Sequence, residues 1–252
     1  VKWSDGAPFS ADDMIFYYED WQFNTDLAPN LSRNWRPGGK PMTFTKVDDY
    51  TVQFDFAVPN WAFYAIMRSS PPQTPWRPKH YAQQFHPKYN KAVTDYKEFD
   101  DKILWRQNPD CPSLTAWVPE SYEPGTARAW VRNPYYYAVD TEGNQLPYID
   151  RIDEIQVEDA EVQKLTIMQG GVDYIHFHRL ALADVSVLKE NEAKGDYEVR
   201  FWDSGSGTGM MYFWNHDVQD ENLRALYRDV RFKRAMSYAI DRATIQRVVY
   251  YN

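Results

Sequence analysis

The sequence predicts a mixed α/β fold, and three patterns support this prediction. From about residue 115 to 202, strand-like and helix-like segments alternate with short connections, as they do where helices cover a sheet. Earlier in the chain, Val52, Phe54 and Phe56 alternate with polar residues, which is typical of a half-buried strand. Apolar residues recur at helical spacing near both ends of the chain. We therefore expect helices and mixed sheets together.

The first helix begins within the stretch KWSDGAPFSADDMIFYYED (2–20), which holds four aspartates. A metal loop or a carboxylate pair would also cluster acids, but the alternating aspartate order of a calcium loop is missing. The Ser10 side chain can accept from a first-turn amide while Asp13 reaches back to the Ser10 amide, which is a capping box. We predict a helix start here and not a reactive site. Its apolar side is predicted to consist of Met14, Ile15, Tyr18 and Trp21.

The rest of the first half is predicted to combine one hairpin with short helices. Residues 25–41 are rich in proline and glycine and read as a loop. Strands are expected over 42–47 and 51–57, joined by a turn at Asp48-Asp49-Tyr50. Helices are expected over 61–68, 79–85 and 89–105.

After Pro112 the pattern of the sequence changes, and strand-like segments become frequent. Strands are expected over 115–121, 127–132, 152–157, 174–177, 197–202 and 210–214. Helices are expected over 160–169, which ends at Gly170-Gly171, over 181–192, and as one long helix over 230–250.

The net charge and the composition of the chain exclude several classes of protein. The formal charge of −8 would repel a long polyanion, so no nucleic acid partner is expected. No apolar run has the length needed to cross a bilayer. The 252 residues contain 17% aromatic residues, and such amphipathic rings suit a protein that holds ligands. The ends, VKWSDG and TIQRVVYYN, carry no leader and no helix stop, so we expect part of a longer chain.

Two residue types could bind a metal or act as a nucleophile. His176 and His178 would lie on the same side of a strand and could share a metal, but a third zinc ligand at a known spacing is missing. Hydrogen-bonded or solvated histidines are the preferred interpretation. Cys111 stands alone, so there is no internal disulfide, and no companion for a Cys–His nucleophile can be placed.

Acidic residues near 154–161 could supply the carboxylate pair of a glycoside hydrolase. Acids that flank a helix start more often interact with the helix dipole, which is the preferred interpretation. The members of this group are Glu154, Glu158, Asp159 and Glu161. Because no catalytic constellation remains, we predict a protein that is not an enzyme and needs no cofactor or metal.

The stretch SGSGTG (204–209) interrupts two apolar segments. Its glycines would let a ligand or another backbone approach closely. A plain flexible turn is an equal alternative. A phosphate loop is not supported, because no Gly-Lys-Ser/Thr follows.

Several segments resemble, in order and spacing over nearly the whole chain, the family 5 extracellular solute-binding proteins. These are the peptide- and oligopeptide-binding receptors of bacterial ABC importers. The matching segments are KWSDGAPFSADDMIFYYED (2–20), TVQFDFAVPN (51–60), PKHYAQQFHPKY (78–89), RNPYYY (132–137), the run from GNQLPYID to GGVDYI (143–175), YFWNHDVQD (212–220) and DVRFKRAMSYAIDRATI (229–245).

The resemblance implies a periplasmic binding protein-like type II fold with two lobes joined by a hinge, present here only in part. Residues 1–115 would form the accessory subdomain of the first lobe, and residues 116–209 its mixed sheet. Residues 210–252 would contain the crossover strand and the start of the second lobe. A solute would be enclosed between the lobes as they close.

The resemblance also suggests which residues contact the solute. Met211 and Phe213, on the crossover strand, would lie near it, with Gly207 and Gly209 at its backbone. Trp35 and Trp202 are added from their chemistry alone, with core packing as the alternative for each.

The implied function is that of a receptor that captures a peptide-like solute and delivers it to the transmembrane permease subunits of an ABC importer. An oligosaccharide solute is the alternative within the family, and a glycoside hydrolase is the alternative from another class. We expect a monomer in the periplasm or another extracytoplasmic compartment, with a lipid anchor in a segment upstream.

Overall fold

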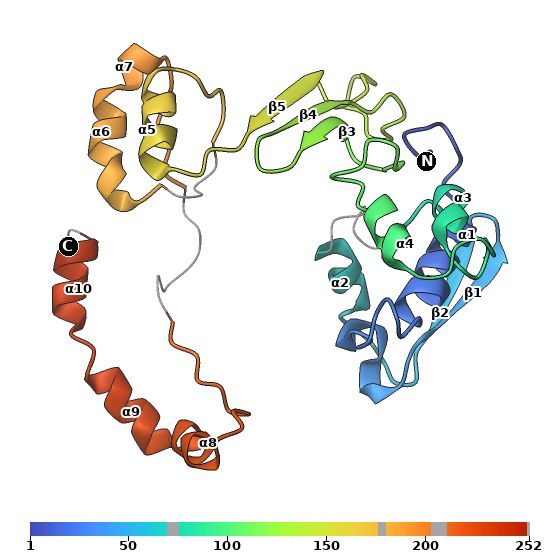
Figure 1. The fold of residues 1–252 in the computed structure, drawn as a ribbon, viewed down its shortest axis with the longest axis horizontal. Coiled ribbons are helices and arrows are strands. Elements are labelled where there is room, and N and C mark those ends of the chain that lie inside the picture. Colours follow the sequence, from blue (N-terminus) through green and yellow to red (C-terminus); the bar gives the residue numbers. More distant parts are fainter. Residues whose placement is uncertain (70–75, 176–179, 203–210, 251–252) are drawn as a thin grey trace. The chain divides into compact units, whose positions relative to one another are not determined.

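The computed structural model describes residues 1–69, 76–175, 180–202 and 211–250 (Figure 1). The chain divides into two compact units, Val1–Gln156 and Val157–Asn252. Within the described ranges, no helix is both long and apolar enough to cross a membrane. The predicted boundaries after residues 115 and 209 concern the lobes of the whole protein and stay predictions.

The first unit begins with α1 (Ala11–Ile15), which continues as a π-helical segment, η1 (Phe16–Gln22). The predicted capping box is confirmed, since the Ser10 hydroxyl accepts from the Asp12 N–H at 3.3 Å and the Asp13 carboxylate accepts from the Ser10 N–H at 2.9 Å. These two bonds satisfy amide donors that a helix start leaves free.

The predicted hairpin is also confirmed. Strands β1 (Thr43–Asp48) and β2 (Thr51–Asp55) pair antiparallel with Phe44 opposite Phe54. The Asp48 side chain accepts from the Tyr50 N–H at 2.8 Å and so fixes the turn. Figure 1 shows this hairpin beside α1.

Short helices and turns complete the part of the first unit that precedes its three-stranded sheet. They are η2 (Arg33–Trp35), η3 (Pro37–Gly39), α2 (Phe63–Ser69), α3 (Lys79–Ala82), η4 (Gln83–Phe85) and α4 (Lys97–Lys102).

The predicted helix over 89–105 is wrong for most of its length, because only α4 is helical there. The side chain of Asn90 accepts from the Ala92 N–H at 3.0 Å, and that of Asp95 accepts from the Lys97 N–H at 2.9 Å. These local bonds compete with the helical ladder, as Asn and Asp commonly do.

Two aromatic-rich clusters form the core of the first unit, and α1–η1 contributes to both. Phe16 belongs to one cluster, whereas Tyr17 and Tyr18 belong to the other. The rings of Tyr18 and Phe44 stack with centroids 3.9 Å apart. Burying each such side chain contributes about 1.5–3 kcal/mol. The first cluster contains Trp3, Tyr17, Tyr18, Met42, Phe44, Trp76 and Leu114, and the second contains Phe16, Ala82, Phe99 and Ile103.

A three-stranded antiparallel sheet follows, in the order β3 (Trp117–Glu123), β4 (Ala127–Arg132) and β5 (Arg151–Ile155). The three predicted strands in this region are therefore confirmed. Asn133, at the end of β4, is fully buried and donates to the Thr115 carbonyl at 2.8 Å, which ties the sheet to the segment before it.

The second unit opens with α5 (Ala160–Met168), as predicted, and Gly170 with φ +74° ends it. Three short pieces then replace the predicted helix over 181–192. They are η5 (Leu182–Asp184), α6 (Val185–Glu190) and α7 (Glu192–Gly195). Asn191 interrupts the helix, because its side chain donates to the Val187 carbonyl at 2.8 Å.

Three helices end the chain: α8 (Glu221–Arg228), α9 (Val230–Tyr238) and α10 (Arg242–Val249). The predicted single helix over 230–250 is wrong. Asp241 starts a new helix by accepting from the Thr244 N–H at 2.9 Å, and Arg242 donates to the Ser237 carbonyl at 2.6 Å. Helix α8 was not predicted, although the Asp220 side chain caps it by accepting from the N–H groups of Asn222 and Leu223.

None of the three predicted strands over 174–177, 197–202 and 210–214 is present among the described residues. Residues 197–202 and 211–214 lack regular secondary structure, and so do 174–175. A strand requires a partner for its ladder of hydrogen bonds, and the described sheets use only β1–β5. Residues 176–177 and 210 lie outside the described ranges.

Candidate functional site

The acidic stretch at the start of the chain has a structural role centred on Asp13. The Asp13 carboxylate is 3% exposed. It accepts from the Trp3 indole N–H at 3.2 Å and from the Lys79 N–H at 2.8 Å, besides its bond from Ser10. Burial raises the pKa of Asp13 although these three N–H groups oppose the shift. Both oxygens accept hydrogen bonds, so this carboxylate joins three segments of the chain.

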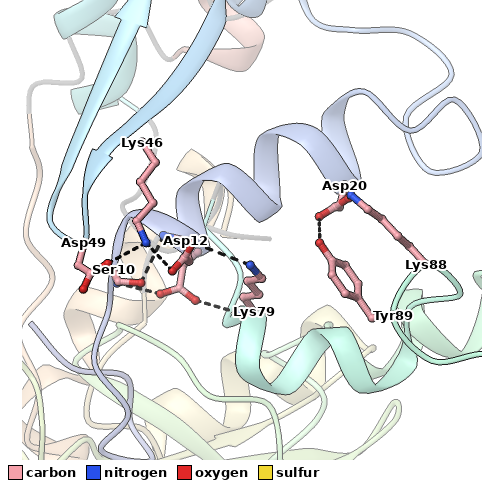
Figure 2. Close-up of polar contacts among 9 residues, drawn as sticks. Ser10, Asp12, Asp20, Lys46, Asp49, Lys79, Lys88 and Tyr89 are labelled. Atoms are coloured by element: carbon pink, nitrogen blue, oxygen red, sulfur yellow. Dashed lines mark hydrogen bonds and ion pairs between the residues drawn. The ribbon is translucent and has the colours of Figure 1, made fainter.

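The neighbouring Asp12 takes part in a surface network. Lys46 lies 2.8 Å from Asp12 and 2.8 Å from Asp49, so one ammonium bridges α1 and the β1–β2 turn (Figure 2). The hydrogen bond from Lys46 lowers the pKa of Asp12. Exposed ion pairs of this kind contribute about 0–1 kcal/mol to stability. Here the Lys46 ammonium compensates the negative charge of Asp12 and Asp49.

A second buried acid, Asp20 at 6% exposure, was not predicted. Its carboxylate accepts from Lys88 at 2.5 Å and from the Tyr89 hydroxyl at 2.5 Å (Figure 2). Burial, and the bond to Asp20, raise the pKa of Tyr89 to about 12. One signal was available, because Asp20 is four residues after Phe16 and so shares its apolar side of the helix.

His86 completes this network from the core. It is 1% exposed and lies among the rings of Phe16, Tyr96 and Phe99. Its Nε2 lies 3.2 Å from the Asp20 carbonyl, and its Nδ1 accepts from the Lys88 N–H at 3.2 Å. These partners require the neutral Nε2–H tautomer, and burial lowers the pKa of His86 accordingly. The arrangement holds the turn in place and leaves neither ring nitrogen for chemistry.

Three of the four carboxylates considered for glycoside hydrolysis make structural contacts within the chain. Asp159 caps α5 by accepting from the N–H groups of Glu161 and Val162. Glu154 pairs with Arg128 across β4 and β5 at 3.7 Å. Glu161 lies 2.6 Å from Lys164 on the same helix. The dipole-partner interpretation is confirmed for Asp159.

The structure describes the surroundings of the cysteine but not those of the candidate metal ligands. His176 and His178 lie outside the described residues. Across the described ranges, no group of three or more His, Cys, Asp or Glu side chains is arranged to hold a metal ion. Cys111 is 2% exposed, and burial raises the pKa of its thiol to about 12, so it is protonated and unreactive.

The predicted solute contacts differ in their surroundings. Trp202, Met211 and Phe213 are 77%, 62% and 84% exposed in this chain. Trp35 is half-buried, and its ring lies 5.8 Å from each of Tyr18 and Phe44 within the core of the first unit. Gly207 and Gly209 lie outside the described residues. All six stay predictions.

Comparison with known proteins identifies the family. The family described as bacterial extracellular solute-binding proteins, family 5 Middle, matches residues 1–252. The chain belongs to this family. Because this is a family of solute-binding proteins and not of enzymes, the predicted family and the predicted lack of catalysis are confirmed.

Named relatives support the assignment of the chain to family 5. The chain is 30% identical over 255 residues to a periplasmic alpha-galactoside-binding protein of Rhizobium meliloti, covering 96% of this chain and 35% of that protein. It is 29% identical over 250 residues to a probable ABC transporter-binding protein of Deinococcus radiodurans, covering 96% of this chain and 40% of that one.

Solved structures confirm the predicted mixed α/β fold of periplasmic binding proteins. The oligopeptide-binding protein OppA matches with a TM-score of 0.73 and 33% identity over 98% of this chain and 41% of OppA. The periplasmic binding protein MelB of Agrobacterium fabrum C58, in complex with stachyose, matches with a TM-score of 0.70 and 26% identity over 98% of this chain and 37% of MelB. The family 5 chain thus spans between 35% and 41% of the length of these relatives.

Proposed function

We propose that this chain is the middle part of the solute-binding receptor of an ABC importer, and that its solute is an oligosaccharide of the α-galactoside class. The receptor captures the solute between two lobes and delivers it unchanged to the transmembrane permease subunits. It works as a monomer in the periplasm or another extracytoplasmic compartment, with a lipid anchor in a segment upstream.

The observation that carries the solute class is the similarity to the alpha-galactoside-binding protein, at 30% identity over 96% of this chain. MelB, solved with stachyose, supports the same class at 26% identity. Stachyose is itself an oligosaccharide with α-linked galactose. Two matches with different names therefore indicate one kind of solute.

The exposed aromatic side chains agree with a sugar ligand. Ligand sites are lined by apolar and aromatic faces with a few polar groups that fix orientation. The rings of Trp202 and Phe213 are 77% and 84% exposed. A flat apolar ring face can cover the C–H face of a pyranose, while backbone groups and hydroxyls satisfy its polar edge.

A peptide-like solute is the second candidate, and it rests on OppA. That protein is 33% identical to this chain and is named as oligopeptide-binding. Peptide recognition would rely on backbone groups and on charges for the ends of the peptide. The two candidates therefore differ in whether charged ends are required.

Calorimetric titration of the whole protein distinguishes these solutes. Stachyose, the β-linked glucose oligosaccharide cellotetraose and a mixed tetrapeptide library would each be titrated, and the recovered solute would be analysed by mass spectrometry. We expect saturable binding of stachyose alone and recovery of intact stachyose. Binding of the peptides but not of stachyose would overturn the α-galactoside class in favour of a peptide-like solute. Failure of all three solutes to bind would refute the receptor role.

A further inference from the structure

Trp214 is anchored at the point where an extended segment meets α8 and α9. Its ring centroid lies 5.4 Å from that of Tyr227 on α8 and 4.9 Å from that of Phe232 on α9. The rings of Tyr227 and Phe232 are 6.0 Å apart, so the three rings form one cluster. Trp214 is half-buried, whereas its neighbour Phe213 is 84% exposed. The chain therefore passes from an anchored ring to a free one within one residue.

The segment after Trp214 is held by Arg228. Its Nε donates to the His216 carbonyl at 2.9 Å, and its Nη2 donates to the Asp217 carboxylate at 2.9 Å. The planar guanidinium offers these two donors in a fixed geometry, which a lysine cannot reproduce. Arg228 thus fixes both the backbone and a side chain of the segment.

Arg224 holds the next two residues in the same way. Its Nε donates to the Val218 carbonyl at 2.8 Å, and its Nη2 donates to the Gln219 carbonyl at 2.7 Å. Arg224 and Arg228 are four residues apart on α8, so they lie on the same side of the helix. Together they bond to four consecutive residues, 216–219, and we call this arrangement the guanidinium clamp.

The guanidinium clamp restricts a short segment and contributes little to the stability of the whole chain. Arg228 and Asp217 have side chains that are 56% and 90% exposed. Exposed charged pairs contribute little to global stability. Four directed bonds on a short segment instead restrict its conformations, and a restricted segment loses less entropy when it binds a ligand.

We propose that Arg224 and Arg228 are positioning residues for solute binding. By fixing 216–219, and with it Trp214, they hold the exposed ring of Phe213 ready to cover the apolar face of a sugar unit. The inference rests on the proposed function, because it assigns to Phe213 a contact with the same solute. Neither arginine touches the solute in this arrangement.

The test uses the whole protein and two readouts. Stachyose affinity is measured by calorimetry, and hydrogen–deuterium exchange is followed in the peptide that spans 211–220. Arg228→Gln and Arg224→Gln should each weaken stachyose binding about tenfold, because the segment must then be ordered on binding. Both should also accelerate amide exchange in the peptide.

Matched variants separate positioning from general damage. Arg231→Gln removes an exposed arginine that pairs with Asp229 and makes no bond to the clamp, so both readouts should stay at wild-type values. Arg228→Lys should recover part of the affinity, since lysine can make one of the two bonds. Phe213→Ala should weaken binding without a change in exchange.

Each result supports or overturns the inference. Faster exchange with unchanged affinity would refute the positioning role, and unchanged exchange would refute the clamp itself. If the wild type binds a tetrapeptide and not stachyose, the sugar class fails while the clamp is tested with that peptide. If the wild type binds neither solute, the proposed function and this role fall together. If Arg228→Gln does not fold, Arg224→Gln and Arg228→Lys give the same comparison.

Discussion

Trp3 donates its indole N–H to the buried carboxylate of Asp13 over 3.2 Å. The same carboxylate accepts the backbone N–H groups of Ser10 and Lys79. The N-terminal segment, the start of α1 and the start of α3 therefore meet at one side chain. A buried carboxylate is tolerated at such a point because both of its oxygens accept hydrogen bonds.

Replacing Asp13 by Ala should destabilise the first unit strongly. The substitution leaves the N–H groups of Trp3, Ser10 and Lys79 without their acceptor, and we expect a loss of about 3 kcal/mol in the free energy of unfolding. Urea denaturation of the whole protein, followed by tryptophan fluorescence, measures this loss.

The matched control for that substitution is Asp12→Ala. Asp12 is an exposed neighbour that pairs with Lys46, so its loss should cost at most about 1 kcal/mol. Equal effects of the two substitutions would show that burial of Asp13 is not what stabilises this junction.

Local signals explain the parts of the fold that were predicted correctly. The capping box at Ser10 and Asp13, the alternation of Val52 and Phe54 in β2, and the glycine stop at Gly170 each depend on residues close in sequence. Such patterns report the local conformation directly. They sufficed for the hairpin, for β3–β5 and for α5.

The errors have two sources: interactions that a local pattern does not contain, and local signals that a stronger pattern outweighs. The apolar residues of 197–202 fit a strand, but a strand forms only where another strand pairs with it. In the long segment 230–250, the helical period hides the break at Asp241, whose cap is visible only when its bond to Thr244 is considered. The capping residue Asp241 was visible in the sequence, but the helical spacing of the apolar residues was given more weight.

The candidate site was less predictable than the fold. Met211 and Phe213 carry no local signal for binding, and only the family resemblance suggests them. Arg224 and Arg228 were missed, because no helix was predicted over 221–228. Their bonds to 216–219 become visible only in three dimensions.

The stability of the first unit should fall as the pH falls below about 6.5. Burial lowers the pKa of His86 below its ordinary value of 6.5, so the folded protein holds the neutral form while the unfolded chain binds a proton. The stabilisation is present above the unfolded-state pKa and is lost as the pH falls toward the folded-state pKa. Urea midpoints measured from pH 7.5 to 5 check this.

The His86→Gln variant supplies the comparison for the pH titration. It should be less stable at pH 7.5, because the bonds to Asp20 and Lys88 are disturbed, and it should show a smaller dependence on pH below 6.5. An unchanged slope would assign the acid sensitivity to other groups.

Cys111 should resist alkylation in the folded protein. Its thiol is 2% exposed and its pKa is raised to about 12, so almost no thiolate is present at pH 8. Incubation with iodoacetamide should leave the mass of the peptide containing Cys111 unchanged, and the same treatment in urea should modify it. Rapid labelling of the folded protein would contradict the burial of this thiol.

Gly170 should be far less tolerant of substitution than Gly143, although both have positive φ angles of +74° and +86°. A Cβ at Gly170 would lie 2.6 Å from the Gly195 carbonyl oxygen, whereas a Cβ at Gly143 would meet nothing within 4 Å. Gly143→Ala should therefore cost only the backbone strain of about 1–2 kcal/mol, and Gly170→Ala should add a steric cost of about 1–3 kcal/mol. Denaturation midpoints of the two variants measure the difference. Equal midpoints would mean that the close approach of Gly170 to Gly195 is relieved at no cost by movement of α5 and α7.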